Sequence, residues 1–262
     1  MIPADDADAG SVLILGDSLA FHGPDGAYPP TDPRLFGTRV GQGLGKTVDL
    51  VARPGWTTRD IWWALTKDPV VWGVYLPRAS HVLLAVGGMD ALPAAAPTWV
   101  RESISFIRPG ALRRRVRSAF LRASPVVIKT SSGRLRQLPQ HATDHYLSRI
   151  VSGIRTFRPH VAIATLTPAP YRSALYPSAA PHASAVAAMH AWAGEAKVDV
   201  IDLEPLSAHF THDASTPPAN PDGLHWSWPM HEQVAEDILA LWGDPLSEQP
   251  LNEQPPSSAR CD

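Results

Sequence analysis

Short apolar runs alternate along the chain with longer segments in which apolar positions repeat at helical spacing. The runs predict strands at residues 11–15, 46–52, 80–86, 160–166 and 198–203. The first run is apolar almost throughout, which is typical of a strand buried on both faces of a sheet. The helical spacing predicts, among other helices, an alanine-rich one at about 183–197 and a last one at about 229–242.

Two helix starts can be located from capping residues. Asp32 followed by Pro33 is typical of an N-cap and a first helical residue, so we expect a helix from there to about residue 44. Thr57 or Thr58 can cap the next helix, with Asp60 in its first turn, where a negative charge is favourable.

Alternating strands and helices limit the architecture to an α/β fold with a doubly wound, parallel, five-stranded sheet and helices on both faces. Ligands of such sheets bind outside the carboxyl ends of the strands. We expect a flexible N-terminus at 1–10, a single folded domain at 11–243 with a helical, Arg-rich insert at about 92–140, and a disordered tail at 244–262, which is rich in Pro, Ser, Glu and Gln.

Composition excludes several classes of protein. The 262 residues include 44% hydrophobic ones, enough for a full core, while the formal net charge of −2 gives no overall attraction to nucleic acid or anionic membranes. The sequence contains no stretch of about 18 apolar residues, the length that a helix needs to span a bilayer. Cys261 is the one cysteine and has no partner for an intramolecular disulfide. The acidic N-terminus lacks a signal core, so we expect a cytoplasmic protein.

A serine at the end of the first strand and an Asp-x-x-His segment near the other end of the chain supply candidate chemistry. Ser18 follows the strand, and Asp222 lies three residues before His225. Acyl transfer by serine needs a nucleophilic oxygen, an imidazole that takes its proton and a carboxylate that orients the imidazole. These residues can fill the three roles, although each pattern alone is common. His22 is too close to Ser18 to replace His225, and we expect it in a loop near the pocket mouth.

Four blocks in the chain occur in the order of the SGNH hydrolase superfamily, also called GDSL hydrolases, which the sequence resembles. They are residues 12–19, 52–58, 85–90 and 222–225. The resemblance implies that Ser18 is the nucleophile and that Asp222 and His225 complete the triad. It also implies that the backbone N–H groups of Ser18 and Gly55 form the oxyanion hole, with no resident cofactor and no metal site.

The third block departs from the family pattern, because Met89 stands where the family has asparagine. A thioether cannot donate a hydrogen bond to an oxyanion, and loss of one such donor costs on the order of 10²–10³ in rate. Either two N–H groups suffice or another donor has moved in. Met89 itself can line an apolar acyl pocket or simply pack in the core.

The insert concentrates arginines, among them Arg113, Arg114, Arg115 and Arg117. Guanidinium groups bind carboxylates and phosphates in a two-pronged geometry, so an anionic substrate is one interpretation. A solvated basic helix face is the other. RNA binding is disfavoured, because no nucleic-acid motif accompanies the cluster.

A narrower resemblance links the chain to the diglucosylglycerate octanoyltransferase family. The residues that carry it are the tryptophan-rich segment after Gly55, the Gly87-Gly88-Met89-Asp90 block, the arginine run and Trp226 after the Asp-x-x-His segment. It implies transfer of an octanoyl group from octanoyl-CoA to a sugar hydroxyl of diglucosylglycerate, in methylglucose lipopolysaccharide biosynthesis. Candidate substrate-binding residues are Asp17, Trp56, Met89, Asp90, Arg113, Arg114 and Trp226.

Three alternatives stay open at this point. For the tryptophans, a packing role competes with contact to sugar, because such side chains bury large areas. For the reaction, an esterase or thioesterase would use the same acyl-enzyme with water as the acceptor. A carbohydrate-binding module without catalysis is the remaining alternative, and the missing asparagine is what favours it. The oligomeric state is not predicted.

Overall fold

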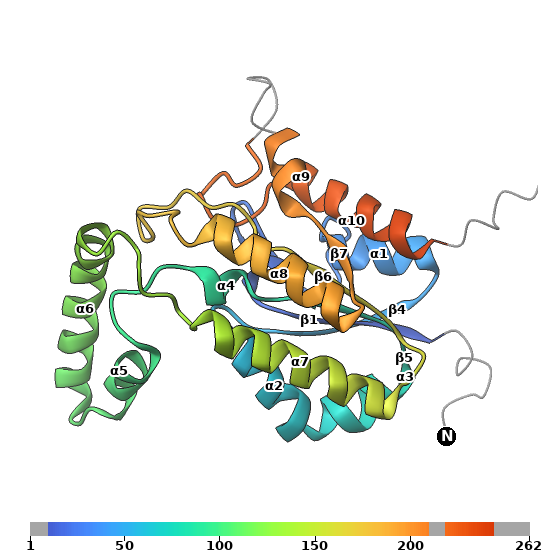
Figure 1. The fold of residues 1–262 in the computed structure, drawn as a ribbon, viewed down its shortest axis with the longest axis horizontal. Helices are drawn as coiled ribbons and strands as arrows, with labels where there is room; N and C mark the ends of the chain where they lie inside the picture. Colours follow the sequence, from blue (N-terminus) through green and yellow to red (C-terminus); the bar gives the residue numbers. More distant parts are fainter. Residues whose placement is uncertain (1–9, 210–217, 244–262) are drawn as a thin grey trace, which may run out of the picture.

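Five parallel strands form the centre of the computed structural model, which describes residues 10–209 and 218–243 (Figure 1). In spatial order they are β4 (Thr47–Ala52), β1 (Ser11–Gly16), β5 (Ala79–Ala85), β6 (Ala162–Leu166) and β7 (Asp199–Ile201). Every neighbouring pair is parallel, which confirms the predicted sheet. The predictions for the tail at 244–262 and, apart from Gly10, for the N-terminus fall outside the described residues.

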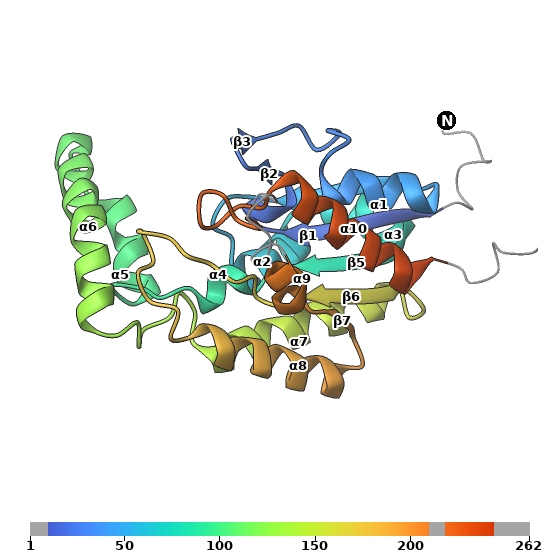
Figure 2. The ribbon, with the colours of Figure 1, turned by 90° about the horizontal axis from the view of Figure 1, so that it is seen from above.

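Helices cover both faces of this sheet (Figure 2). One face carries α2 (Thr58–Lys67), α7 (Gln140–Phe157) and α8 (His182–Ala196), and the other carries α1 (Phe36–Leu44) and α10 (Trp228–Trp242). Strand β1 shows why both layers form. Leu13 and Leu15 point into the first layer and Val12 and Ile14 into the second, as successive side chains of a strand must.

Helix α1 begins at Phe36, three residues after the predicted first residue. The cause is local, because the Asp32 carboxylate accepts hydrogen bonds from the backbone N–H and the guanidinium of Arg34. Such side-chain bonds stabilise a turn in competition with a helix. Asp32 therefore closes a turn before α1 and does not cap the helix. At α2 the prediction is confirmed, since Thr57 is the N-cap and donates to the Asp60 carboxylate through its N–H and its hydroxyl.

Helix α7 is missing from the predicted elements, although its sequence carries a signal. Its buried side chains Leu147, Ile150, Val151 and Ile154 recur at helical spacing and pack under β1 and β5. Its N-cap is Pro139, whose side chain makes no capping bond, so no start signal marks the boundary with the insert.

The segment predicted as an insert, at about 92–140, lies beyond the carboxyl ends of the strands (Figures 1 and 2). It contains α5 (Thr98–Ser103), the short 3-10 helix η4 (Ile104–Phe106) and α6 (Gly110–Thr130). Ile128 is the one buried residue of α6, whereas Trp99 and Phe106 are 72% and 80% exposed. Backbone bonds from Ala94 to Leu135 and from Gln137 to Leu92 tie the two ends of the insert together.

The remaining elements are short. They are η2 (Ser18–Ala20), the antiparallel pair β2 (His22–Gly23) and β3 (Gly26–Ala27), the π-helix η3 (Val71–Tyr75), α3 (Leu76–Arg78), α4 (Gly88–Ala91) and α9 (Leu203–His209). Within the described ranges, no helix has both the length and the apolar composition needed to cross a membrane.

The strand order places a topological switch between β1 and β5, because the chain turns outward in opposite directions from these two strands. Crevices at such switch points are where doubly wound sheets bind ligands. Ser18 follows β1, and the Gly87-Gly88-Met89-Asp90 block follows β5, so both border this crevice.

Candidate active site

A tight turn after β1 presents Ser18 at the sheet edge. The Asp17 N–H donates to the carbonyl of Ala85 on the neighbouring strand, at 3.3 Å. The Asp17 side chain caps η2 by accepting from the Leu19 N–H at 2.9 Å. The strand, the cap and the short helix together fix the direction in which the Ser18 hydroxyl leaves the sheet.

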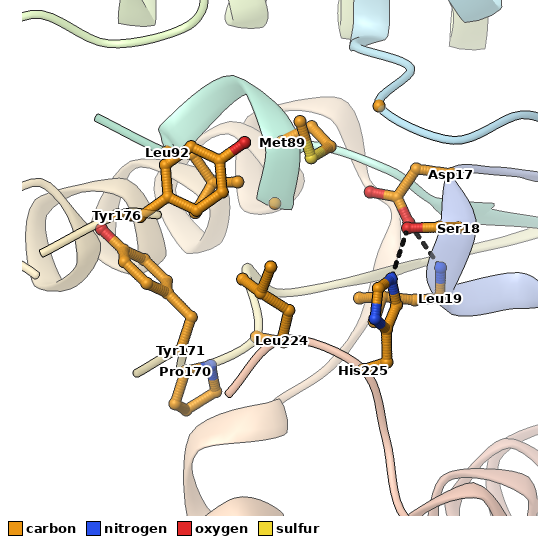
Figure 3. Close-up of a pocket in the computed structure, with 13 residues that line it drawn as sticks. Asp17, Ser18, Leu19, Met89, Leu92, Pro170, Tyr171, Tyr176, Leu224 and His225 are labelled. Carbon is orange, nitrogen blue, oxygen red and sulfur yellow. Dashed lines mark hydrogen bonds between the residues drawn. The ribbon is translucent and has the colours of Figure 1, made fainter. Parts of the chain in front are cut away.

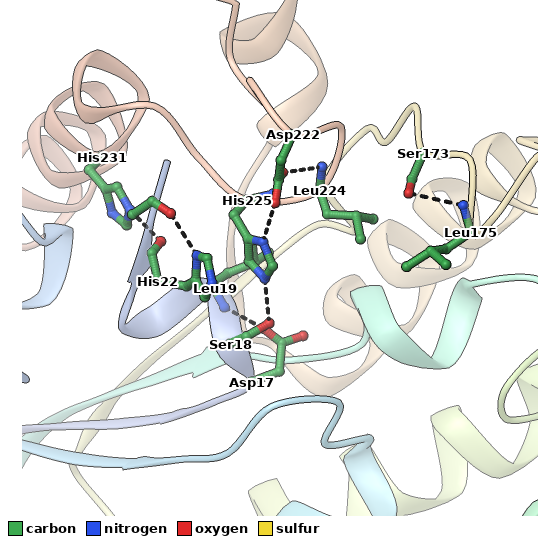
Figure 4. Close-up of polar contacts among 11 residues, drawn as sticks. Asp17, Ser18, Leu19, His22, Ser173, Leu175, Asp222, Leu224, His225 and His231 are labelled. Atoms are coloured by element: carbon green, nitrogen blue, oxygen red, sulfur yellow. Dashed lines mark hydrogen bonds and ion pairs between the residues drawn. The ribbon is translucent and has the colours of Figure 1, made fainter. Parts of the chain in front are cut away.

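Ser18, His225 and Asp222 come together although 207 positions separate the first two (Figure 4). His225 Nε2 lies 3.2 Å from Ser18 Oγ, and His225 Nδ1 lies 2.7 Å from Asp222 Oδ2. The other Asp222 oxygen accepts from the backbone N–H groups of Leu224 and His225. The geometry is that of a nucleophile, a base and a residue that orients the base.

Hydrogen bonds stabilise the negative charge of the Asp222 carboxylate. Partial burial acts to raise the pKa of its carboxyl, but the hydrogen bonds from the His225 side chain and from the backbone of His225 and Leu224 outweigh it and lower the pKa. Asp222 is therefore an anion at neutral pH and holds a proton on His225 Nδ1, which leaves Nε2 free to accept a proton from Ser18.

A glycine allows the His225 loop to approach the rest of the protein. Gly223 has φ +83°, and a Cβ at this position would lie 1.9 Å from the carbonyl oxygen of Arg172. The Arg172 N–H donates to the Gly223 carbonyl at 2.8 Å, and Asn220 Nδ2 donates to Pro170. These contacts fix the loop against the segment that follows β6.

The imidazole ring of His22 packs against that of His225. The His22 ring stacks on His225 with centroids 3.6 Å apart and planes inclined by 16°. His22 is held in turn by His231, whose Nε2 lies 3.1 Å from the His22 carbonyl oxygen (Figure 4). Burial above all lowers the pKa of His231 to about 4, so this ring is neutral. His22 lies on β2 near the pocket, where it limits the ring rotation of His225.

Ser18 opens into a largely apolar cavity of about 200 Å³ (Figure 3). Its wall is formed by the turn after β1, the block after β5, the loop after β6 and the His225 loop. The lining residues are Asp17, Ser18, Leu19, Gly55, Gly88, Met89, Leu92, Ala169, Pro170, Tyr171, Tyr176, Leu224 and His225. The two tyrosines were not predicted, because no motif marks the loop that carries them.

Two predicted substrate contacts are close to the nucleophile. Met89 lines the cavity, and its methyl group is the nearest atom, at 3.9 Å, to the position that a Cβ on Gly55 would occupy. Gly55 has φ +74°, a conformation that favours glycine. Asp17 also lines the cavity, with a side chain that is 3% exposed. Among the described residues, no group of three or more His, Cys, Asp or Glu side chains could hold a metal ion.

Other predicted contacts need correction. Trp226 is fully buried between Phe36 and His231, so it cannot touch substrate. Asp90 is 1% exposed, and hydrogen bonds from Thr58 and Thr143 occupy its carboxyl. Both residues lie in segments that carry the family resemblance, but each side chain is buried in the core.

Three further candidates lie outside the cavity lining. Trp56 packs against the core layer that contains α2, with the Arg53 guanidinium over its ring. Arg113 and Arg114 lie on α6, where Arg113 donates to the carbonyl of Ser105. The structure therefore brings the triad together with Gly55, Met89 and Asp17. The side chains of Trp56, Arg113 and Arg114 lie outside this group.

Trp226→Ala should destabilise the fold. Removing this side chain leaves a cavity in the layer between the sheet and α10, and such changes cost about 3–5 kcal/mol of unfolding free energy. Urea unfolding followed by circular dichroism measures the loss. Trp99→Ala, at a position 72% exposed, is the matched control and should change stability by less than about 0.5 kcal/mol. Equal losses in the two variants would contradict the assignment of Trp226 to the core.

Comparison with known proteins agrees with the fold. Residues 14–233 match the GDSL-like lipase/acylhydrolase family, and the chain belongs to this family. Curated relatives include a diglucosylglycerate octanoyltransferase of Mycolicibacterium hassiacum, 38% identical over 87% of this chain and 93% of the relative. A protein of the same name from Mycobacterium tuberculosis is 37% identical over 87% of this chain and 90% of its own length.

Solved structures share the fold at low identity. A lipase/acylhydrolase from Enterococcus faecalis superposes with a TM-score of 0.58 at 16% identity, covering 88% of this chain and 94% of the other. The acetyl xylan esterase AlAXEase gives a TM-score of 0.55 at 13% identity over 88% and 98%. The sheet and its helices are therefore a scaffold common to these proteins.

Proposed function

We propose that this protein is an acyltransferase that moves an octanoyl group from an acyl-CoA to a sugar hydroxyl of diglucosylglycerate, in the synthesis of methylglucose lipopolysaccharides. The observation that carries the proposal is the Ser18–His225–Asp222 geometry within an apolar cavity. The identity of 37–38% to two curated octanoyltransferases over nearly their whole length supports the choice of substrates.

The reaction follows a double-displacement route. Ser18 Oγ attacks the thioester carbonyl while His225 Nε2 takes the hydroxyl proton, and the carbonyl electron pair moves onto its oxygen. The intermediate collapses as the C–S bond breaks and the CoA thiolate takes the proton from His225. The sugar hydroxyl then attacks the Ser18 ester, His225 removes its proton, and Ser18 recovers it when the product ester leaves.

The developing oxyanion needs donors that are fixed in advance. The backbone N–H groups of Ser18 and Gly55 are the proposed pair, since both residues border the cavity. The acyl chain is proposed to lie against the apolar wall formed by Met89, Leu92 and Leu224. There a flexible thioether can adapt to an alkyl chain.

The arginines of α6 are proposed to meet anionic groups of the substrates at the edge of the site. Arg113 and Arg114 lie outside the cavity on an exposed helix, so they are suited to the phosphates of the acyl donor and not to its acyl group. Transfer also requires that water be kept from the acyl-enzyme, because water would hydrolyse it.

A substrate panel tests the reaction class. We expect octanoyl-CoA with diglucosylglycerate to give a sugar ester, identified by mass spectrometry, at a rate well above that of octanoic acid release. Acyl-CoA donors of two to sixteen carbons measure the selectivity for the acyl chain. Acceptors with and without the glycerate carboxylate measure the selectivity for the acceptor. Free acid alone, whatever the acceptor, would make the protein a hydrolase.

A further inference from the structure

We propose that the Asp17 side chain stays protonated during catalysis and donates a hydrogen bond to the oxyanion, in the place of the amide that the family has at Met89. This inference rests on the proposed function, because it assigns a third oxyanion donor to the same site. Asp17 keeps its proton throughout, and only its hydrogen bond strengthens as negative charge develops on the substrate oxygen.

The Asp17 carboxyl group lies at the wall of the cavity. One carboxyl oxygen of Asp17 accepts from the Leu19 N–H, and the other has no hydrogen-bond partner among the described residues. In Figure 3 this second oxygen points toward the Met89 side of the cavity, away from Leu19. The cavity that it faces is also bordered by Ser18 and Gly55, whose N–H groups are the proposed oxyanion donors.

The surroundings of Asp17 disfavour a negative charge. Its side chain is 3% exposed, and none of the residues that line the cavity with it is a lysine or an arginine. No cationic side chain forms an ion pair with it within the described part of the chain. Burial, more than any other cause, raises the pKa of Asp17 to about 7; the Leu19 N–H opposes the rise, and the charge of Asp90 adds to it.

The hydrogen bonds of Asp90 determine which of the two buried carboxyls, Asp17 or Asp90, keeps its proton. It accepts hydrogen bonds from the Thr58 N–H at 3.0 Å, the Thr58 hydroxyl at 2.5 Å and the Thr143 hydroxyl at 3.1 Å. Asp17 accepts from the Leu19 N–H, its own N–H adds a smaller stabilisation of the charged form, and no side-chain donor bonds it within the described ranges. Because hydrogen bonds to the charged form stabilise it, Asp90 ionises first and its charge then opposes ionisation of Asp17.

The chemistry requires the neutral form. A carboxylate beside the oxyanion would repel it, whereas a carboxylic acid offers an O–H donor, which the Met89 thioether lacks. Neutral carboxylic acids are known to act as oxyanion donors in apolar sites of other enzymes. The missing asparagine and the buried, cation-free Asp17 therefore have one common explanation.

Ionisation of Asp17 sets the direction of the expected pH dependence. Asp17 is neutral below a pH of about 7 and ionises above it, so kcat/KM should fall as the pH rises. The fall should approach tenfold per pH unit and level off about 10²-fold below the maximum, the cost of losing one donor. Other titratable groups that face Asp17 are Asp90, His225, Tyr171 and Tyr176. Burial raises the pKa of both phenols, that of Tyr171 to about 12, so neither causes this fall.

The decisive variant is Asp17→Asn, in which an amide donates and cannot ionise. We expect its kcat/KM for hydrolysis of 4-nitrophenyl octanoate, corrected for the uncatalysed rate, to stay within about threefold of its own maximum from pH 7 to pH 9. The matched control is Asp49→Asn. This buried carboxyl is bound by Ser11 and Arg78 at the other end of the sheet, so the variant should keep the alkaline fall.

A second pair of variants tests replacement of the lost amide. Asp17→Ala should lose about 10²-fold in kcat/KM at pH 6.5, and adding Met89→Asn should recover at least tenfold. The inference is overturned if wild-type activity does not fall by pH 9, if Asp17→Asn shows the same fall as wild type, or if Met89→Asn recovers nothing. Labelling of Ser18 by a phosphonate in these variants separates such a failure from failure of the proposed function, which would leave Ser18 unlabelled in the wild type.

Discussion

Ser18→Ala should abolish acyl transfer while the fold remains intact. The variant has no oxygen to form the acyl-enzyme, and removal of the nucleophile from a triad costs on the order of 10⁶ in kcat. The Ser18 hydroxyl makes one side-chain hydrogen bond, to His225, so its loss leaves the core unchanged. Octanoyl-CoA consumption, followed by release of the free thiol, measures the effect.

Two controls make the Ser18 result specific. Ser152→Ala alters an exposed serine on α7 and should retain wild-type activity. Incubation with octanoyl-CoA in the absence of acceptor should add one octanoyl mass to the wild type and none to Ser18→Ala. Turnover by Ser18→Ala at more than a few per cent of the wild-type rate would exclude the covalent route.

His225→Gln should lower kcat/KM by about 10²–10⁴, the usual contribution of a general base. Glutamine keeps a polar group beside Asp222 but cannot accept the Ser18 proton. His22, although it stacks on His225, is not expected to take over, because its Nδ1 lies 2.6 Å from the Gly23 carbonyl and its ring is parallel to the base it would replace.

His160→Gln is the control for His225, since His160 is an exposed histidine in the loop before β6. It should leave both kcat and KM unchanged. If His225→Gln retains most of the activity while a His22→Gln variant loses it, the roles of the two stacked rings would be exchanged.

The pattern of the chain was sufficient to predict the five strands of the sheet and the helices α1, α2, α8 and α10. Continuous apolar runs mark strands covered on both faces, and their alternation with helices leaves few topologies. Helix starts were not predicted correctly where a candidate capping side chain bonded another group, or where no capping side chain was present. The Asp32 carboxylate accepts from Arg34 in a turn and does not cap a helix, and α7 begins at Gln140, after an N-cap residue, Pro139, that makes no side-chain capping bond.

Some residues of the candidate site could be predicted from the sequence and others could not. Ser18, Asp222 and His225 were identified from motifs, since their roles depend on residue type and local spacing. Trp226 stands directly after His225, yet its side chain is buried in the core against Phe36 of α1 and His231 of α10. Adjacency along the chain therefore did not predict adjacency in the site.

By itself the sequence determined which side chains can react, because nucleophile, base and carboxylate are properties of residue types at strand ends and in a short loop. Only the tertiary structure decided that His22 stacks on the base, that Tyr171 and Tyr176 line the cavity, and that Asp17 is buried near Asp90 with no ion-pair partner among the described residues. Contacts of this kind join segments far apart in the chain, and burial is set by everything that packs around a group, so no local pattern encodes them.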